Sequence, residues 1–166
     1  FYVIKYGELL GFRPDSTGYR LPTEAEWEWA NKSKGAKRTK FSWGAQYPPP
    51  EQTGNFTDES VNRSVDSINN YNDGFPVSSP VASFQSNSKG LFDMDGNVAE
   101  WVHDFYDATP DTRPAQDPLG PIGGSAHVIK GSSWKRSSVT ALRSSYRFSG
   151  NDAAEDLGFR VARYAR

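Results

Sequence analysis

The sequence predicts a loop-rich α+β domain with little regular secondary structure, on the strength of three observations. Fifteen glycines and eleven prolines interrupt the 166 residues, and both are residues of turns and loops. Only one segment, Thr23–Asn31, carries a complete helix signal. Three short strand-like segments close the chain, at Val128–Lys130, Ala141–Tyr146 and Leu157–Val161.

Two helices are expected in the first part of the chain. Apolar side chains at positions 1, 2, 4, 6, 9 and 10 predict a short amphipathic helix over Phe1–Leu10, which Gly11 and Pro14 end. The second helix begins after Thr23, an N-cap residue with Glu26 three positions on as its capping-box partner. We expect it to continue to Asn31.

The segment from Lys32 to Lys89 shows little periodicity, and glycine, proline and asparagine recur throughout it. A loop of this length is unusual inside a compact domain. Bound cations are one physical means of holding it. The next segment, Gly90–Asp104 (GLFDMDGNVAEWVHD), has a different, acidic and turn-rich character.

Composition limits the class of protein. The length fits one domain over residues 1–166, and no linker or repeat divides it. The net charge is −1, so the chain as a whole has no basic excess. This balance argues against nucleic-acid binding, which needs a clustered basic excess. No apolar run approaches the roughly 20 residues of a membrane helix. The chain contains no cysteine, so its own residues form no disulfide and no thiolate metal site.

Five segments, in this order and spacing, resemble the formylglycine-generating enzyme (sulfatase-modifying factor) family. They are Tyr19–Ala30 (YRLPTEAEWEWA), Gly90–Trp101 (GLFDMDGNVAEW), Lys130–Trp134 (KGSSW), Leu142–Arg147 (LRSSYR) and Leu157–Arg163 (LGFRVAR). The resemblance implies a variant of the C-type lectin fold, with two or three helices and short antiparallel strands. The chain looks like the later two-thirds of the family domain, without the family's N-terminal segment.

Acidic and amide side chains crowd the segment Gly90–Trp101, where a cation would offset the repulsion between carboxylates. From the residues alone, a solvated acidic turn is the alternative. The resemblance implies a calcium site here, with Asn97 bracing the turn. Its ligands would be the side chains of Asp93 and Glu100 and the carbonyls of Gly96 and Val98.

The resemblance also implies a second calcium site in the long loop. Its ligands would be the side chains of Asn55 and Asp73 and the carbonyls of Phe56 and Phe75. One or two structural calcium ions would then replace the backbone pairing that these loops lack.

Copper chemistry is not expected. Family members that generate formylglycine bind copper through two cysteines that follow the Gly-Ser-aromatic motif, here Gly131–Trp134. The first cysteine position falls near Arg136 and the second between Val139 and Ala141. None of these side chains is a soft ligand for Cu(I).

Iron chemistry, used by another branch of the family, has weak support. The chain has only two histidines, His103 and His127, without the spacing of a helical ligand pair. We interpret both as ordinary surface or packed histidines. No G-x-S-x-G motif points to a hydrolase.

Large rings and arginines are interpreted as structural. Trp27, Trp101 and Trp134 are expected in the core. Arg143, Arg147 and Arg160 are expected to bind carboxylates and carbonyls across the loops, with recognition of a substrate carboxylate as the alternative.

The resemblance places a surface groove after the Gly-Ser-aromatic motif, with residues 149–152 nearby. Its polar lining suits a protein, peptide or glycan ligand, and a plain exposed loop is the alternative. The candidate binding residues are Ser133, Lys135, Arg136, Ser138 and Thr140.

The sequence therefore predicts a non-catalytic, calcium-stabilised binding or structural module. The alternative is an oxidoreductase of the same family, of the sulfatase-modifying or non-haem-iron type, completed by residues outside this chain. Calcium sites of millimolar affinity fill only outside the cytosol, so a periplasmic or extracellular location is expected.

Overall fold

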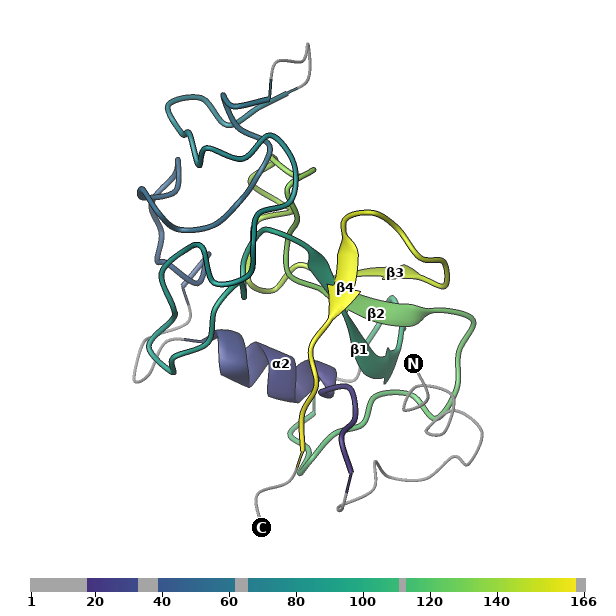
Figure 1. Cartoon of the computed structure of the whole chain (residues 1–166). Coiled ribbons are helices and arrows are strands. Elements are labelled where there is room, and N and C mark those ends of the chain that lie inside the picture. Colours follow the sequence, from purple (N-terminus) through teal and green to yellow (C-terminus); the bar gives the residue numbers. More distant parts are fainter. Residues whose placement is uncertain (1–17, 33–38, 62–65, 111–112, 164–166) are drawn as a thin grey trace.

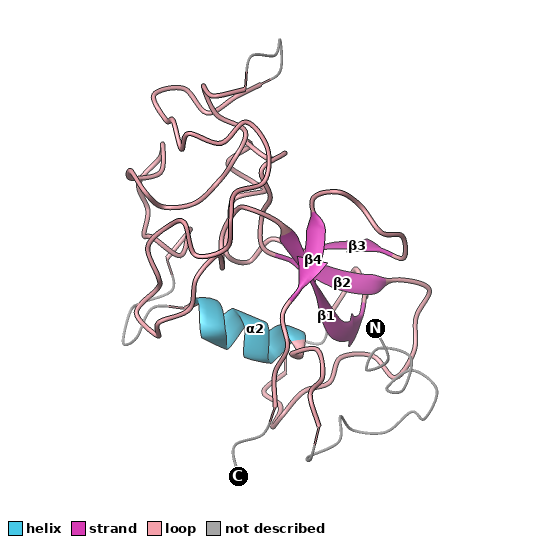
Figure 2. Cartoon of the chain, viewed as in Figure 1, coloured by secondary structure: helices cyan, strands magenta, loops and turns pink. Residues whose placement is uncertain are grey.

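The computed structural model describes residues 18–32, 39–61, 66–110 and 113–163. Its described part contains one helix, α2 (Glu24–Asn31), and four strands, β1 (Ala99–Phe105), β2 (His127–Lys130), β3 (Phe148–Gly150) and β4 (Leu157–Phe159). Loops make up most of the rest, as Figure 2 shows. The predicted α+β class with low regular content is confirmed, while the predicted helix over Phe1–Leu10 lies outside the described residues.

The four strands form one sheet in the order β3-β2-β1-β4. β2 is antiparallel to both β1 and β3, with Trp101 opposite Ile129 and Val128 opposite Ser149. β4 returns parallel to β1, with Glu100 opposite Gly158. The parallel pairing departs from the antiparallel strands expected from the resemblance. It brings the C-terminal motif beside the acidic motif.

Helix α2 begins as the sequence predicts. The Thr23 side chain accepts a hydrogen bond from the Glu26 backbone N–H, and the Glu26 carboxylate accepts one from the Thr23 N–H. These reciprocal bonds satisfy two N–H groups that have no partner within the helix. The helix ends at Asn31, also as expected, and its buried Trp27 faces the sheet residues Val102 and Val128.

The long loops pack around a second apolar cluster. Phe41, Phe56, Ile68, Tyr71 and Leu142 are buried together, and Figure 1 shows the blue-to-teal loops on one side of the sheet. Leu142 reaches this cluster from the connection between β2 and β3. The loops are therefore held by large side chains as well as by isolated backbone hydrogen bonds.

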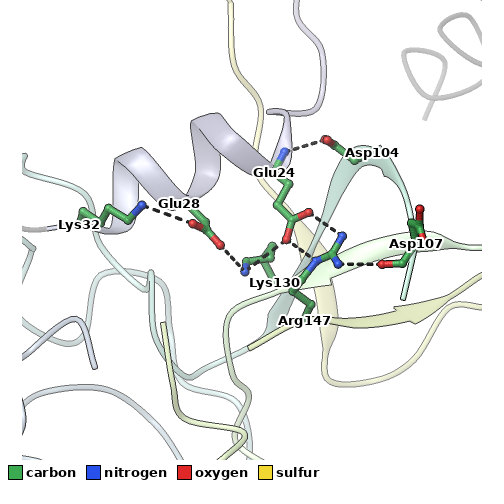
Figure 3. A network of polar contacts seen from close by, with 7 residues as sticks. All are labelled: Glu24, Glu28, Lys32, Asp104, Asp107, Lys130 and Arg147. Atoms are coloured by element: carbon green, nitrogen blue, oxygen red, sulfur yellow. Dashed lines mark hydrogen bonds and ion pairs between the residues drawn. The ribbon is translucent and has the colours of Figure 1, made fainter. Parts of the chain in front are cut away.

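A network of charged side chains joins α2 to the sheet (Figure 3). The ammonium group of buried Lys130, at the end of β2, lies 3.1 Å from a Glu28 carboxylate oxygen and 3.5 Å from one of Glu24. Arg147 binds the same Glu24 carboxylate at 2.6 and 2.9 Å. Since the Gly-Ser-aromatic motif starts directly after Lys130, this network fixes the entry to the predicted binding segment.

The strand predicted over Ala141–Tyr146 is wrong. This segment forms turns, in which the N–H of Leu142 bonds the Ser138 carbonyl and the N–H of Tyr146 bonds the Arg143 carbonyl. The apolar residues that suggested a strand include Ala141 and Leu142, which are buried within these turns. The strand begins later, at Phe148.

Candidate functional site

A pocket of about 190 Å³ lies over the sheet, beneath the connection between β3 and β4. All four strands contribute to its lining, and one residue of the predicted binding segment joins them. The lining residues are Ala99, Ile129, Arg136, Phe148, Ser149, Gly150, Asn151, Asp152, Ala154, Asp156 and Leu157. The pocket therefore combines apolar and polar lining residues, and its volume lies below the roughly 300–1,000 Å³ of most small-molecule sites.

Arg136 is the cation of this lining. Its backbone is fixed, because its N–H bonds the Ser133 carbonyl at 3.0 Å and its carbonyl accepts from the Thr57 N–H at 3.0 Å. Its guanidinium lies 5.5 Å from the centre of the Phe148 ring, in a cation–π contact. The side chain has no ion pair or hydrogen bond with the described residues.

The neighbours of Arg136 are already paired. The Ser133 hydroxyl is buried and donates to the Asp156 carboxylate at 2.7 Å, and Lys135 forms an ion pair with Glu155. Both contacts hold the connection after β3 against the two residues that flank Trp134. This connection therefore frames the pocket.

The other predicted binding residues do not line the pocket. Ser138 accepts a hydrogen bond from the Ala141 N–H, which caps a turn, and Thr140 is exposed in that turn. The structure thus brings Arg136 and residues 149–152 together, with Ser133 behind them. The contributions of Ala99, Ile129 and Leu157 depend on the order of the strands, and no sequence signal marks them.

The two segments predicted to bind calcium lie against each other. A Cβ atom on Gly54 would come within 2.4 Å of the Asp95 carbonyl oxygen, and one on Gly96 within 2.4 Å of the Asn55 carbonyl oxygen. The Asn97 N–H bonds the same Asn55 carbonyl at 2.9 Å. The glycines thus permit a close backbone junction between the two segments.

Asn97 braces its turn, as expected. It adopts a left-handed conformation with φ of 58°. Its amide oxygen accepts from the Ser79 N–H at 3.1 Å, and its amide nitrogen donates to the Ser79 carbonyl at 3.2 Å. This pair of bonds ties the long loop to the acidic motif.

The predicted site at Asn55 and Asp73 retains oxygen atoms suited to a cation. Asn55 is buried, and its Oδ1 atom has no hydrogen-bond partner among the described residues, a costly state for a buried polar atom. Burial raises the pKa of Asp73 to about 6, against hydrogen bonds from the N–H groups of Phe56 and Phe75. Asp58 lies beside it and accepts a hydrogen bond from the Asp73 N–H. A divalent cation would stabilise these oxygens.

The predicted site at Asp93 and Glu100 is already partly neutralised. Asp93 Oδ1 is buried without a partner in the part of the chain that the structure describes, while Oδ2 accepts from the Ala82 N–H at 2.7 Å. Glu100 is held in a bidentate pair by Arg160, at 2.6 and 2.5 Å, and also accepts from the Trp27 indole. Only part of this ligand set is therefore open to calcium.

No group of three or more histidine and acidic side chains among the described residues forms a metal cluster. The two predicted calcium sites would accordingly depend on backbone carbonyls as well as on Asn55 and Asp93. Among the described residues, each set retains one buried side-chain oxygen without a partner, Asn55 Oδ1 in one and Asp93 Oδ1 in the other, while both Asp73 oxygens accept backbone N–H groups. Calcium at both places stays a prediction.

The histidines and two of the arginines have structural contacts. His127 stacks on Phe105 with ring centres 4.4 Å apart, and the backbone N–H of His103 bonds the Pro22 carbonyl. Arg147 and Arg160 both bind carboxylates and carbonyls, as expected. Trp27 and Trp134 are buried, and Trp101 is half-buried.

This geometry defines a class of protein, a loop-rich α+β domain with a small polar pocket over its sheet. The profile of the family described as "Sulfatase-modifying factor enzyme 1-like domain" matches residues 1–165, and the chain belongs to this family.

Several characterised proteins are similar over most of the chain. The formylglycine-generating enzyme of Streptomyces coelicolor is 35% identical over 150 residues, which cover 87% of this chain and 46% of that protein. The serine/threonine-protein kinase Pkn1 of Chlamydia trachomatis is 36% identical over 156 residues, or 88% of this chain and 21% of the kinase. The domain therefore occurs in proteins with different names and lengths.

Solved structures share the fold. Treponema denticola variable protein 1 superimposes with a TM-score of 0.70 and 31% identity, covering 90% of this chain and 49% of that one. PvdO from Pseudomonas aeruginosa gives a TM-score of 0.71 and 27% identity, covering 99% of this chain and 57% of that one. The chain thus spans about half the length of these structures. None of the described helices is long and apolar enough to cross a membrane.

Proposed function

We propose that this chain is a non-catalytic, calcium-stabilised binding module, and that the pocket at Arg136 receives its ligand. The observation that carries the proposal is this pocket of about 190 Å³, whose rim holds an arginine, a serine, an asparagine and two aspartates. Such a lining suits hydrogen bonding to a peptide or glycan.

The chemistry of the chain supports a binding role over the activity named in its relatives. The sequence contains no cysteine, so this chain supplies no thiolate for copper. Arg136, near the first cysteine position implied by the resemblance, is a strong hydrogen-bond donor and not a redox ligand. The second position falls on Val139, Thr140 or Ala141, and Val139 packs against the loop core.

Two buried side-chain oxygens support the calcium part of the proposal. The segments at Asn55 and Gly96 meet in a backbone junction, and Asn55 and Asp93 each hold a buried oxygen that no described residue binds. Calcium ions at these positions would stabilise the loops from which Thr57 supports Arg136. Concentrations that fill such sites are found outside the cytosol, which is where we place the protein.

A blocking substitution tests the pocket. Ala154 lines the pocket, whereas its neighbour Ala153 is exposed and does not. We expect Ala154→Trp to abolish enrichment of peptides from a displayed random-peptide library, or of sugars from a glycan array, while Ala153→Trp leaves binding unchanged. Equal binding by both variants would refute a ligand site at this pocket.

An activity assay tests the non-catalytic part. The purified chain, incubated with copper, oxygen and a cysteine-containing sulfatase peptide, is expected to leave the cysteine unchanged by mass spectrometry. Conversion of that cysteine to formylglycine would overturn the proposal.

A further inference from the structure

The pairing of arginines with carboxylates differs at the pocket from elsewhere in the structure, and this difference bears on the kind of ligand. Three other arginines are each bound to a carboxylate of the protein: Arg20 to Glu26, Arg147 to Glu24 and Arg160 to Glu100. Arg136 lies among the pocket residues without such a partner in the described part of the chain. Its planar fork of donors therefore remains available for an acceptor from outside.

The geometry points to a carboxylate as that acceptor. Guanidinium groups bind carboxylates through two parallel hydrogen bonds, and these bonds are stronger than those between neutral groups. The Arg136 side chain is already restricted by its contact with the Phe148 ring at 5.5 Å and by its fixed backbone. Less conformational entropy is therefore lost when a ligand binds it.

The nearby acidic side chains do not occupy this fork. Asp156 accepts the Ser133 hydroxyl at 2.7 Å, and Glu155 is bound to Lys135. Asp152 lines the pocket and is exposed, and with Asp156 it gives the lining two carboxylates against the one cation, Arg136, which disfavours a highly charged anion. The pocket therefore selects a ligand that places one carboxylate at Arg136, and not a highly charged anion.

An extended peptide fits better than a sugar. Sugar rings commonly stack on an open aromatic face, but Phe148, the one aromatic side chain among the described lining residues, is covered by Arg136 and lies 5.8 Å from the Tyr146 ring. β3, which contributes three residues to the pocket, is an edge strand in the described sheet. An edge strand offers backbone donors and acceptors to another polypeptide chain.

We propose that the pocket recognises an extended peptide through one carboxylate bound to Arg136. This inference rests on the proposed binding function and adds the class of ligand. The carboxylate belongs either to an acidic side chain or to a C-terminus, and the experiment distinguishes the two.

The first measurement is selection from a displayed random-peptide library in calcium-containing buffer. Wild-type chain is compared with Arg136→Glu and with Lys40→Ala, which removes an exposed cation that does not line the pocket. We expect wild type and Lys40→Ala to enrich peptides with an acidic residue at one position, and Arg136→Glu to enrich basic residues there. Circular dichroism checks that each variant is folded.

The second measurement changes the peptide and leaves the protein intact. An enriched peptide with a blocked C-terminus is compared with its Glu→Gln form, and with the Gln form carrying a free C-terminal carboxylate. If a side chain supplies the carboxylate, we expect the Glu→Gln change to weaken binding at least tenfold. If the terminus supplies it, the free-terminus peptide is expected to regain that affinity.

Contrary outcomes separate this inference from the proposed function. Enriched peptides without a carboxylate requirement, still blocked by Ala154→Trp, would overturn the inference alone. Binding of oligogalacturonate that needs Arg136, with no peptide enriched, would also overturn it in favour of a glycan. Failure of every probe to bind in a pocket-dependent way would overturn both.

Discussion

Arg147 forms a bidentate pair with Glu24, with Nε 2.6 Å and Nη2 2.9 Å from the two carboxylate oxygens, although 123 residues separate them. The pair joins the first turn of α2 to the segment that leads into β3. The remaining nitrogen of the Arg147 guanidinium, Nη1, donates to the Asp107 carbonyl at 2.8 Å, so the guanidinium connects three parts of the chain. This connection, together with the ion pairs of Lys130, joins the helix to the sheet.

Replacement of Arg147 by methionine is expected to destabilise the fold. The side chains of Arg147 and Glu24 are only 18% and 16% exposed, so the variant leaves a largely buried carboxylate with Lys130 as its remaining partner. We expect a loss of roughly 2–4 kcal/mol in the free energy of unfolding, measured in urea. In a double-mutant cycle with Glu24→Gln, additive effects would contradict direct coupling between the two side chains.

Gly96 tests the junction between the two predicted calcium segments. An added Cβ would lie 2.4 Å from the Asn55 carbonyl oxygen, and φ is +79°, so Gly96→Ala combines a backbone clash with conformational strain. We expect a loss of more than about 2 kcal/mol in the free energy of unfolding. Gly90 is the control, because its φ is +77° but nothing lies within 4 Å of an added Cβ.

Gly90→Ala is therefore expected to lower the free energy of unfolding by the conformational strain alone, about 1 kcal/mol. Equal losses for the two variants, measured by thermal or urea unfolding, would show that the close backbone approach at Gly96 is not present in solution.

Asp104 is expected to make stability depend on pH. Burial raises its pKa to about 6 from 3.8, the nearby Glu24 carboxylate raises it further, and the Glu24 N–H and Arg147 oppose this. Because the folded state holds this proton more tightly than the unfolded state, stability falls as pH rises from about 4 to 6. The whole effect is at most roughly 3 kcal/mol.

Asp104→Asn removes this titration and keeps an oxygen that can accept from the Glu24 N–H. We therefore expect the variant to gain stability relative to wild type between pH 4 and 6, as measured by urea unfolding across that range. A difference between the two proteins that does not change with pH would contradict a raised pKa at Asp104.

Much of the local structure was predictable where a short motif specifies it. The Thr23–Glu26 capping box set the start of α2, and the family resemblance of the segment Gly90–Trp101 implied the bracing role of Asn97. Arg147 and Arg160 were predicted to bind carboxylates because their charges lie in segments that must be partly buried. In each case residues close in sequence carry the signal.

The sheet and the pocket were less visible in the sequence. β1 places Glu100 and Asp104 in buried positions, so the usual alternation of apolar and polar residues is lost. The floor of the pocket depends on β4 returning parallel to β1, a long-range pairing that no local pattern indicates. Only Arg136 and residues 149–152 were found in advance.

For the predicted calcium ligands too, some features were expected and a long-range contact was not. Asn55 and Asp93 were predicted from the family resemblance, and each holds a buried oxygen without a partner among the described residues. Pairing of Glu100 with Arg160 was not predicted, because the two residues belong to different motifs. This pairing matters for calcium binding, because Arg160 already neutralises the charge of Glu100, one of the predicted ligands.

The thermal unfolding midpoint of the chain, measured in calcium and in chelator, tests the calcium-stabilised module most directly. At calcium about a hundredfold above its dissociation constant, one site adds roughly 2.7 kcal/mol, which raises the midpoint of a chain this long by roughly 5–10 °C. Asn55→Ala is expected to lose most of this response, whereas exposed Asn72→Ala keeps it. Magnesium at equal concentration is expected to give a smaller shift. A midpoint that is the same in calcium and in chelator would contradict the account.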